Sequence, residues 1–200
     1  MPRLRLTEMR AALRARHGLA AGGLAGLLLA LAVLGPGAAQ ALRYERAAVA
    51  RGEWWRVLAA HLVHFDLRHL LLNLAGLALL WWLFAPDARS RDWLVVLLVS
   101  ALTVSAGLWF LDPRVGWYLG ASGMLHGVWA AAALAAWPRW RLEAQLTLAL
   151  LAGKLAFERW QGPLSGGPDA ALPVLTAAHL YGALGGLGAA SALRLWRRPV

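Results

Sequence analysis

Long uncharged apolar runs recur along the chain and constrain its fold more than any other feature. A helix needs about 20 such residues to cross the hydrocarbon core of a bilayer. The runs cover residues 18–42, 69–86, 93–111, a stretch within 115–138, about 142–157, and a stretch within 170–193. The fifth is the weakest, because Glu143 and Lys154 interrupt it near its ends. The pattern predicts an all-α polytopic membrane protein with six helices.

The composition supports this class. Of the 200 residues, 60% are hydrophobic and 15% are charged, whereas soluble domains average roughly 45–50% and about 25%. A soluble core of this size could not hide the excess of apolar surface. The composition therefore excludes a soluble α/β enzyme, and the absence of cysteine excludes a secreted domain held together by disulfides.

The net charge of +10 has a topological explanation. If both termini are cytoplasmic, most of the 20 basic residues fall in cytoplasmic segments, as the positive-inside rule requires. These residues are Arg3, Arg5, Arg10, Arg14, Arg16, Arg89, Arg91, Arg139, Arg141, Arg194, Arg197 and Arg198. The charge is thus interpreted as orientation in the lipid bilayer and not as nucleic-acid binding.

The chain is expected to divide into three parts. Residues 1–17 form a basic cytoplasmic tail, residues 18–195 the six-helix domain, and residues 196–200 a short cytoplasmic tail. An alternative concerns the first run, since a basic stretch, an apolar segment and Ala39-Gln40-Ala41 are also typical of a cleavable signal peptide. The long basic region and the five runs that follow favour a retained first helix.

Ionisable groups inside a membrane are costly and mark candidate sites. All ten acids lie in tails, in loops or within a turn of a run's end, so acid-based chemistry is not expected. Three histidines, His61, His64 and His69, are close enough in sequence to approach one metal ion. However, the chain lacks the glutamate of a His-Glu-x-x-His site. No metal or other cofactor is predicted, and hydrogen-bonded histidines are the competing interpretation.

A candidate nucleophile, Ser122, lies in Gly120-Ala121-Ser122-Gly123 at the start of the fourth run. Glycines let the backbone turn tightly and approach a partner. The N-terminus of a helix also offers free N–H groups and a positive dipole end to a developing oxyanion. The same cluster is common where membrane helices pack, so this motif alone does not establish a site.

The sixth run supplies a candidate general base, His179. A strip of small residues continues from it on one helical face: Gly182, Ala183, Gly186 and Ala190. Such a strip allows another helix to pack very closely. If that partner is the fourth helix, His179 lies within hydrogen-bonding reach of Ser122.

The second run adds His69 and Asn73, which lie one turn apart on one face. Both side chains can donate a hydrogen bond to an oxyanion. Asn73 has no apolar reason to lie in a membrane helix, so it either makes a packing hydrogen bond or belongs to a site.

Together these residues resemble the signatures of the rhomboid family of intramembrane serine proteases. Three blocks carry the resemblance, in the family's order: Trp55-Arg56 followed by His61, His64, His69 and Asn73; Gly120-Ala121-Ser122-Gly123; and Ala178-His179 followed by Gly182. The resemblance implies a six-helix core and a Ser122–His179 dyad without a third acid. It also implies an oxyanion pocket formed by the Ser122 N–H, His69 and Asn73, supported by the small residues Gly120, Gly123 and Gly182.

One residue departs from the common pattern. Four residues after the serine, where the family usually has tyrosine, this chain has His126. The variant, with the short chain, resembles the rhombosortase branch. That resemblance implies a multi-pass enzyme of the bacterial inner membrane with its active site on the periplasmic side. The implied substrates are exported proteins with a C-terminal membrane tail: a Gly-Gly-type motif, one helix and a basic end. The tail would be removed, with transfer of the new C-terminus to an acceptor as a further implied step.

Three roles remain open for His126. It can act as a second base, as a hydrogen-bond partner of His179, or as a ring packed where tyrosine usually lies. Two broader alternatives to the sorting enzyme also remain: a general rhomboid protease that cleaves single-span substrates, and a non-catalytic protein that binds them.

Overall fold

The computed structural model describes residues 18, 20–84, 90–162 and 175–196. The predicted tails, apart from Trp196, lie outside these residues, as do Arg89 and the start of the sixth run. The helices span Ala20–Val33, α2 Gly35–Leu42, α3 Arg46–Ala50, α4 Arg56–Ala59, the 3₁₀ helix η1 Ala60–Leu62, α5 Leu67–Phe84, α6 Ser90–Phe110, α7 Ser122–Ala136, α8 Arg141–Gln161 and α9 Thr176–Trp196. Two short strands, β1 Tyr44–Glu45 and β2 Trp117–Tyr118, complete the described elements.

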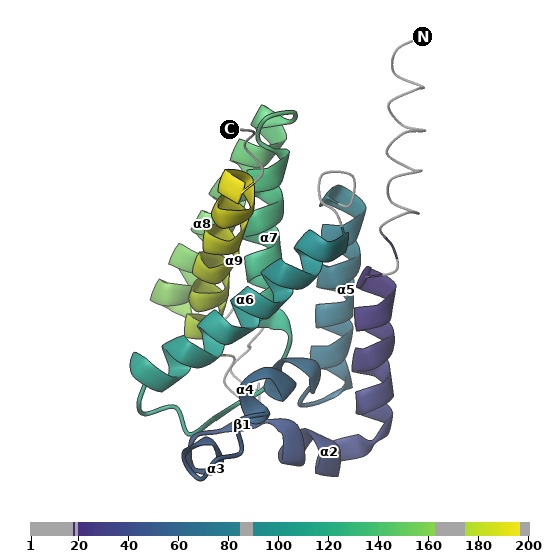
Figure 1. Cartoon of the computed structure of the whole chain (residues 1–200), viewed down its shortest axis with the longest axis vertical. Helices are drawn as coiled ribbons and strands as arrows, with labels where there is room; N and C mark the ends of the chain where they lie inside the picture. The colour runs from purple at the N-terminus through teal and green to yellow at the C-terminus, as the bar shows by residue number, and fades with distance from the viewer. Residues whose placement is uncertain (1–17, 19, 85–89, 163–174, 197–200) are drawn as a thin grey trace.

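Helix α7 is the centre of the bundle and packs against α5, α6, α8 and α9 (Figure 1). It contributes Leu125 and Val128 to the main apolar core, where they meet Leu70 and Leu77 of α5. The helix Ala20–Val33 joins this core through Leu28, which is fully buried. The close packing of these apolar side chains therefore contributes to holding the helices together.

Glycines let α7 and α9 approach almost to backbone contact. A Cβ atom on Gly182 or Gly186 of α9 would come closer than 3.0 Å to the carbonyl oxygen of Gly123 or Gly127 of α7, respectively. Small residues are what such close helix packing requires. The predicted small-residue strip is confirmed, and its partner is the helix that begins at Ser122.

The first apolar run is not one straight helix, so the span predicted there has the form of two helices joined at a bend. It breaks after Val33 into two helices whose axes differ by 113°. Gly35 has φ +77°, a left-handed conformation that glycine adopts without steric cost, and Pro36 follows it. Glycine and proline together end the first helix and turn the chain.

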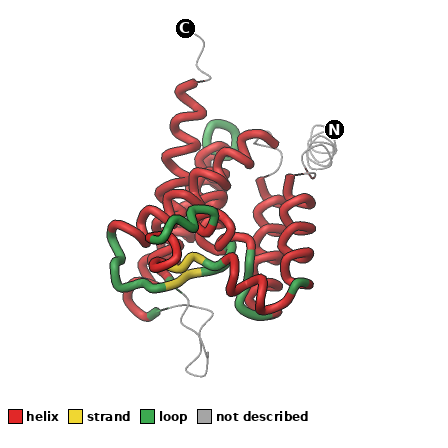
Figure 2. The backbone as a smooth tube through the Cα atoms, turned by 60° about the horizontal axis from the view of Figure 1, so that its bottom comes forward, coloured by secondary structure: helices red, strands yellow, loops and turns green. Residues whose placement is uncertain are grey.

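The segment after the bend contains the one departure from an all-α fold among the described residues. Strand β1 pairs with β2 antiparallel, with Tyr44 opposite Tyr118. Arg46 connects the same segment to the C-terminal end of α6. The Arg46 guanidinium donates hydrogen bonds to the carbonyls of Leu108, Trp109 and Asp112. Figure 2 shows the paired strands at the end of the bundle, beside the loops. The sequence predicted only a loop here.

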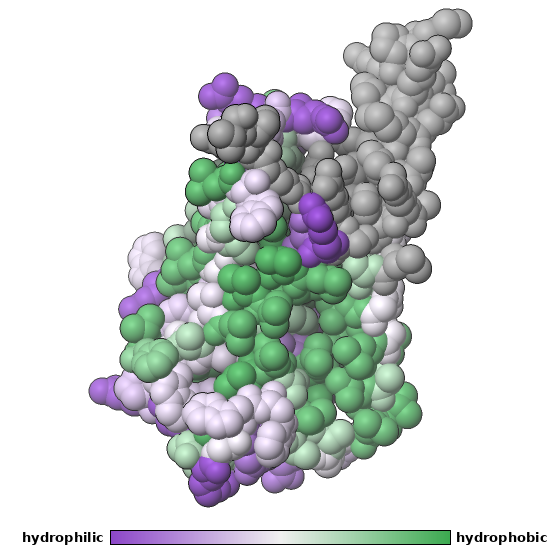
Figure 3. Space-filling view, in the orientation of Figure 1, coloured by the Kyte–Doolittle hydropathy of each residue, from purple (hydrophilic) through white to green (hydrophobic). Residues whose placement is uncertain are grey.

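Two described helices, α5 and residues 91–110 of α6, are long and apolar enough to cross a membrane, and the bent first run makes a third if its halves count together. Helix α8 carries several charges, and α7 has only 15 residues. Figure 3 shows apolar residues gathered over the middle of one face and hydrophilic ones toward its two ends. This distribution is that of a membrane protein. The prediction of six spans stays a prediction.

Candidate functional site

The N-terminal ends of α7 and α9 bring the two principal candidates together. The Oγ atom of Ser122, the first residue of α7, lies 3.0 Å from Nε2 of His179 in the first turn of α9, although the residues are 57 positions apart. His179 is buried, at 4% exposure. A hydroxyl within hydrogen-bonding distance of an imidazole is the geometry of a nucleophile beside a general base.

A carboxylate also touches His179, a contact that the expected Ser122–His179 pair without a third acid does not include. Oε2 of Glu158, in the last turn of α8, lies 2.8 Å from His179 Nδ1. Its other oxygen, Oε1, accepts a hydrogen bond of 2.6 Å from the Lys154 ammonium. Glu158 does lie within a turn of its helix end, as the sequence indicated, but it is buried and not exposed to the outside.

His126 lies flat against His179. The ring centroids are 4.0 Å apart and the ring planes differ by 9°. Nδ1 of His126 donates to the backbone carbonyl of Ser122, one turn earlier, at 2.7 Å. Among the described residues, its Nε2 is buried without a hydrogen-bond partner. Of the three roles considered, this geometry is that of a packed ring.

Two of the three predicted oxyanion donors, His69 and Asn73, are side chains of α5, and His69 lies against the loop that precedes Ser122. A Cβ on Gly120 would come within 2.5 Å of the His69 ring, so the imidazole lies directly over this glycine. Gly120 has φ +119°, which favours glycine independently of the space available. Asn73 is buried, and its Nδ2 donates to the His69 carbonyl at 2.9 Å. This bond lies within α5, one turn back along the chain, and does not join Asn73 to another helix.

Residues outside the sequence motifs hold in place the loop of residues 119–121 that precedes Ser122, called the serine loop below. The Tyr118 hydroxyl donates to the Gly120 carbonyl at 2.8 Å, and the Gly120 N–H donates to the Ala60 carbonyl at 2.9 Å. Burial raises the pKa of Tyr118, so this phenol remains a donor. Sequence reasoning missed Tyr118. The only signal was a polar aromatic residue two positions before Gly120.

The three histidines weighed as metal ligands have other contacts. His61 Nε2 lies 3.2 Å from Ser105 Oγ, which itself donates to the Val57 carbonyl. The His64 and His69 rings meet edge to face, with centroids 5.0 Å apart. Burial lowers the pKa of His61 to about 4. Burial, followed by the proximity of His69, lowers the pKa of His64 to about 4. His61 and His64, which lie outside the long helices of the bundle, are therefore neutral at pH 7.

A different cluster has metal-like spacing. Ligand atoms of His126, Glu158 and His179 lie within 4.8 Å of one another. The stacked rings and the short Glu158–His179 bond already use these groups for contacts with each other. The donor set therefore fits a hydrogen-bonded network better than an ion, and the chelation experiment below discriminates between them.

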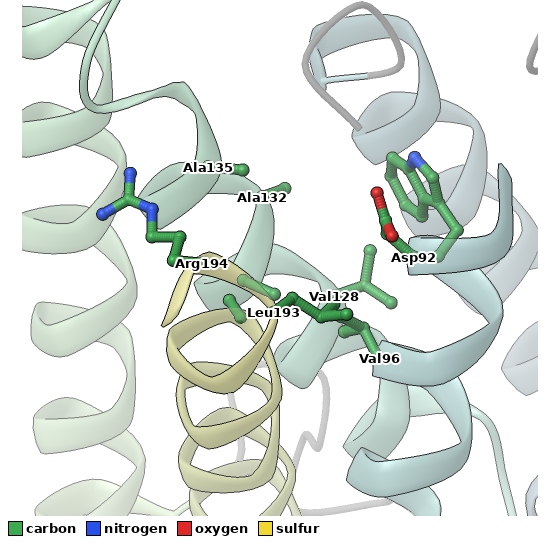
Figure 4. A pocket seen from close by; sticks show the side chains of 10 residues that line it. Asp92, Val96, Val128, Ala132, Ala135, Leu193 and Arg194 are labelled. Atoms are coloured by element: carbon green, nitrogen blue, oxygen red, sulfur yellow. The ribbon is translucent and has the colours of Figure 1, made fainter. Parts of the chain in front are cut away.

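A cavity of about 130 Å³ lies elsewhere, between α6, α7 and α9 at the ends opposite Ser122 and His179. Figure 4 shows Asp92 and Arg194 on opposite sides of the hollow, with Val96, Val128 and Leu193 between them. Its lining residues are otherwise alanines and a tryptophan. A cavity is the usual first candidate for a site, but this lining contains no serine, threonine or histidine.

Comparison with known proteins agrees with the motifs. The family model described as Rhomboid domain matches residues 51–196. Over 84 residues, or 40% of this chain, the sequence is 32% identical to the Bacillus subtilis (strain 168) protein named "Putative rhomboid protease YdcA". The match likewise spans 40% of that relative's length.

Proposed function

The chain belongs to the rhomboid family, and from this premise we propose that it is an intramembrane serine protease in which Ser122 is the nucleophile and His179 the general base. The observation that carries the proposal is the 3.0 Å contact between Ser122 Oγ and His179 Nε2. It joins two motifs that are distant in sequence, at a buried position where ionisable groups are costly without a function.

The reaction is acyl transfer. Ser122 Oγ attacks the carbonyl carbon of a substrate peptide bond while its proton passes to His179 Nε2. The carbonyl oxygen becomes an oxyanion, and the carbon–nitrogen bond breaks when His179 returns the proton to the leaving amine. Water then hydrolyses the acyl-enzyme, or an amine acceptor takes the acyl group.

The oxyanion donors in this proposal are the Ser122 N–H, His69 and Asn73. The Ser122 N–H belongs to the first turn of α7, where backbone donors lack intrahelical acceptors. The His69 ring lies over Gly120, beside the serine loop. Preorganised donors of this kind often make the largest single contribution to such reactions.

The proposed topology has six spans, with both termini in the cytoplasm and the serine facing the periplasm across the bacterial inner membrane. The 15 residues of α7 give a length of about 22 Å, less than the roughly 30 Å of the hydrocarbon core. A helix this short begins below the membrane surface, so Ser122 lies within the bilayer. Arg91, Arg141 and Arg194 lie at the opposite ends of their helices, as cytoplasmic basic residues should.

The proposed substrate is an exported protein with a C-terminal membrane tail of the Gly-Gly type, cleaved as by a rhombosortase. The supporting feature is His126, which stacks on His179 in place of the family's usual tyrosine. A general rhomboid protease acting on single-span proteins is the alternative. The outward leucines of α5, among them Leu71, Leu72 and Leu79, offer a lipid-facing surface along which either kind of helix could approach.

Co-expression with a tail-bearing protein tests both the serine protease mechanism and the proposed Gly-Gly-type substrate. The readout is the intact mass of the product's new C-terminus, with Ser122→Ala as the inactive control and a substrate whose two glycines are replaced by valine as the specificity control. A free carboxylate indicates hydrolysis, and added mass indicates transfer. Cleavage of both substrates favours a general protease. Unchanged cleavage by Ser122→Ala would refute the serine mechanism.

A further inference from the structure

We propose that Glu158 is a positioning residue that extends the Ser122–His179 pair to a triad, with Lys154 as the counter-charge that keeps the carboxylate ionised inside the membrane domain. The inference rests on the proposed function, because it concerns how His179 is held for that reaction. It adds a helix, α8, to the elements that build the site.

The hydrogen bonds decide which nitrogen of His179 carries the proton. An ionised carboxylate can only accept, so the 2.8 Å contact with Glu158 Oε2 requires a proton on His179 Nδ1. In a neutral ring, Nε2 then holds the lone pair and accepts from the Ser122 hydroxyl at 3.0 Å. This is the tautomer that a general base for Ser122 needs.

Glu158 also stabilises the charge that appears during the reaction. When the Ser122 proton moves to Nε2, the His179 ring becomes an imidazolium, and its Nδ1–H continues to donate to Glu158. The carboxylate stays ionised throughout, and the proton on Nε2 leaves with the amine. Every proton is therefore accounted for without a change in the charge of Glu158.

Lys154 explains how an anion can be kept at this position. The Glu158 side chain is 3% exposed, and a buried carboxylate without partners would be strongly destabilising. One oxygen accepts from the Lys154 ammonium at 2.6 Å and the other contacts His179. Lys154 keeps 20% of its side chain exposed, so its ammonium is less buried than the carboxylate that it neutralises.

A purely structural role is the competing interpretation, because a buried ion pair can also join α8 to α9. The two roles differ in what they predict. If Glu158 is a positioning residue, replacing it lowers the rate of serine acylation while the fold persists. If Glu158 is only structural, replacing it lowers stability and activity together. Breaking a buried pair by removing one partner typically costs about 3–5 kcal/mol of stability.

The test is saturation kinetics of Ser122 with a fluorophosphonate probe, which gives a maximal labelling rate and an apparent affinity without a known substrate. For Glu158→Gln we expect the maximal rate to fall about 10²- to 10⁴-fold with unchanged probe affinity, as when a triad acid is made neutral. Glu158→Asp keeps the charge and should recover at least about ten-fold of that loss. Glu143→Gln, at an exposed acid of the same helix, should match wild type.

Melting temperatures of the same purified variants and a chelator control complete the experiment. A Glu158→Gln protein that labels at the wild-type rate would overturn the triad. A much lower melting temperature in Glu158→Gln, with no recovery of the labelling rate in Glu158→Asp, would overturn it as well. Loss of wild-type labelling in EDTA with recovery in zinc would instead make the cluster a metal site. If Ser122→Ala still reacts with the probe, the proposed function itself fails, independently of the Glu158 result.

Discussion

Gly182 of α9 lies against the backbone carbonyl of Gly123 of α7, so closely that a Cβ atom at Gly182 would come nearer than 3.0 Å to that oxygen. The hydrogen bond between Ser122 and His179 depends on this approach, because each residue adjoins the crossing point. The packing of α9 on α7 therefore also sets the distance between Ser122 and His179.

Replacing Gly182 by alanine should therefore separate the two helices. Overpacking typically costs about 1–3 kcal/mol, and we expect a lower melting temperature together with loss of probe labelling at Ser122. Gly188, on the same helix, has open space where a methyl group would lie, so Gly188→Ala is the matched control. It should be neutral or raise stability by up to about 1 kcal/mol. Equal melting temperatures for the two variants would contradict the packing argument.

Asn73→Ala should lower the cleavage rate without abolishing it. One oxyanion donor is worth about 10²–10³ in kcat, whereas Ser122→Ala removes the nucleophile and should leave no acyl-enzyme. The measurement is the rate of product formation in detergent, with Leu98→Ala as control, because Leu98 is an exposed leucine of α6 and lies outside the α5 surface proposed for substrate approach. A wild-type rate for Asn73→Ala would leave the amide with its bond to the His69 carbonyl within α5 and no part in the oxyanion pocket.

His126→Tyr should retain activity within about ten-fold of wild type, because a second aromatic ring can stack on His179 as His126 does. His179→Ala should be inactive, since it removes the nitrogen that contacts Ser122 Oγ. Product mass after co-expression reports both variants. The opposite pattern, with an inactive His126→Tyr and an active His179→Ala, would make His126 the base.

Acidification should destabilise the fold through His61. The free imidazole titrates near 6.5, whereas burial holds the folded-state pKa at about 4. Between these values the unfolded chain binds a proton that the folded chain excludes, so stability is complete above pH 6.5 and falls as the pH decreases toward 4. The loss from this residue at pH 5 is about 2 kcal/mol.

The measurement is the melting temperature between pH 7.5 and 5, compared with that of His61→Gln, whose amide can still donate to Ser105 but does not titrate. The variant should show a shallower pH dependence. If both proteins lose stability in parallel, other groups carry the effect.

The sequence by itself determined the class of fold, the family resemblance and the residues of the three motifs. Uncharged runs must be buried in lipid or protein, and glycines at helical spacing leave a flat surface, so both patterns have direct physical meaning. The strip from His179 through Gly186 therefore predicted a closely packed partner helix, with Ser122 meeting His179 if that partner is the fourth helix, and the structure contains both contacts.

Only the tertiary structure decided which other groups reach the site. In the sequence, Lys154 is a charge that interrupts the fifth apolar run and Glu158 is an acid just beyond its end, and neither position says which way that face of α8 turns. The rotation of α8 against α9 places Glu158 on His179. Likewise, the pairing of Tyr44 with Tyr118 arises from a contact between segments that are distant in the sequence. Local periodicity encodes which face is apolar, whereas the partner of a polar group is set by the packing of the whole bundle.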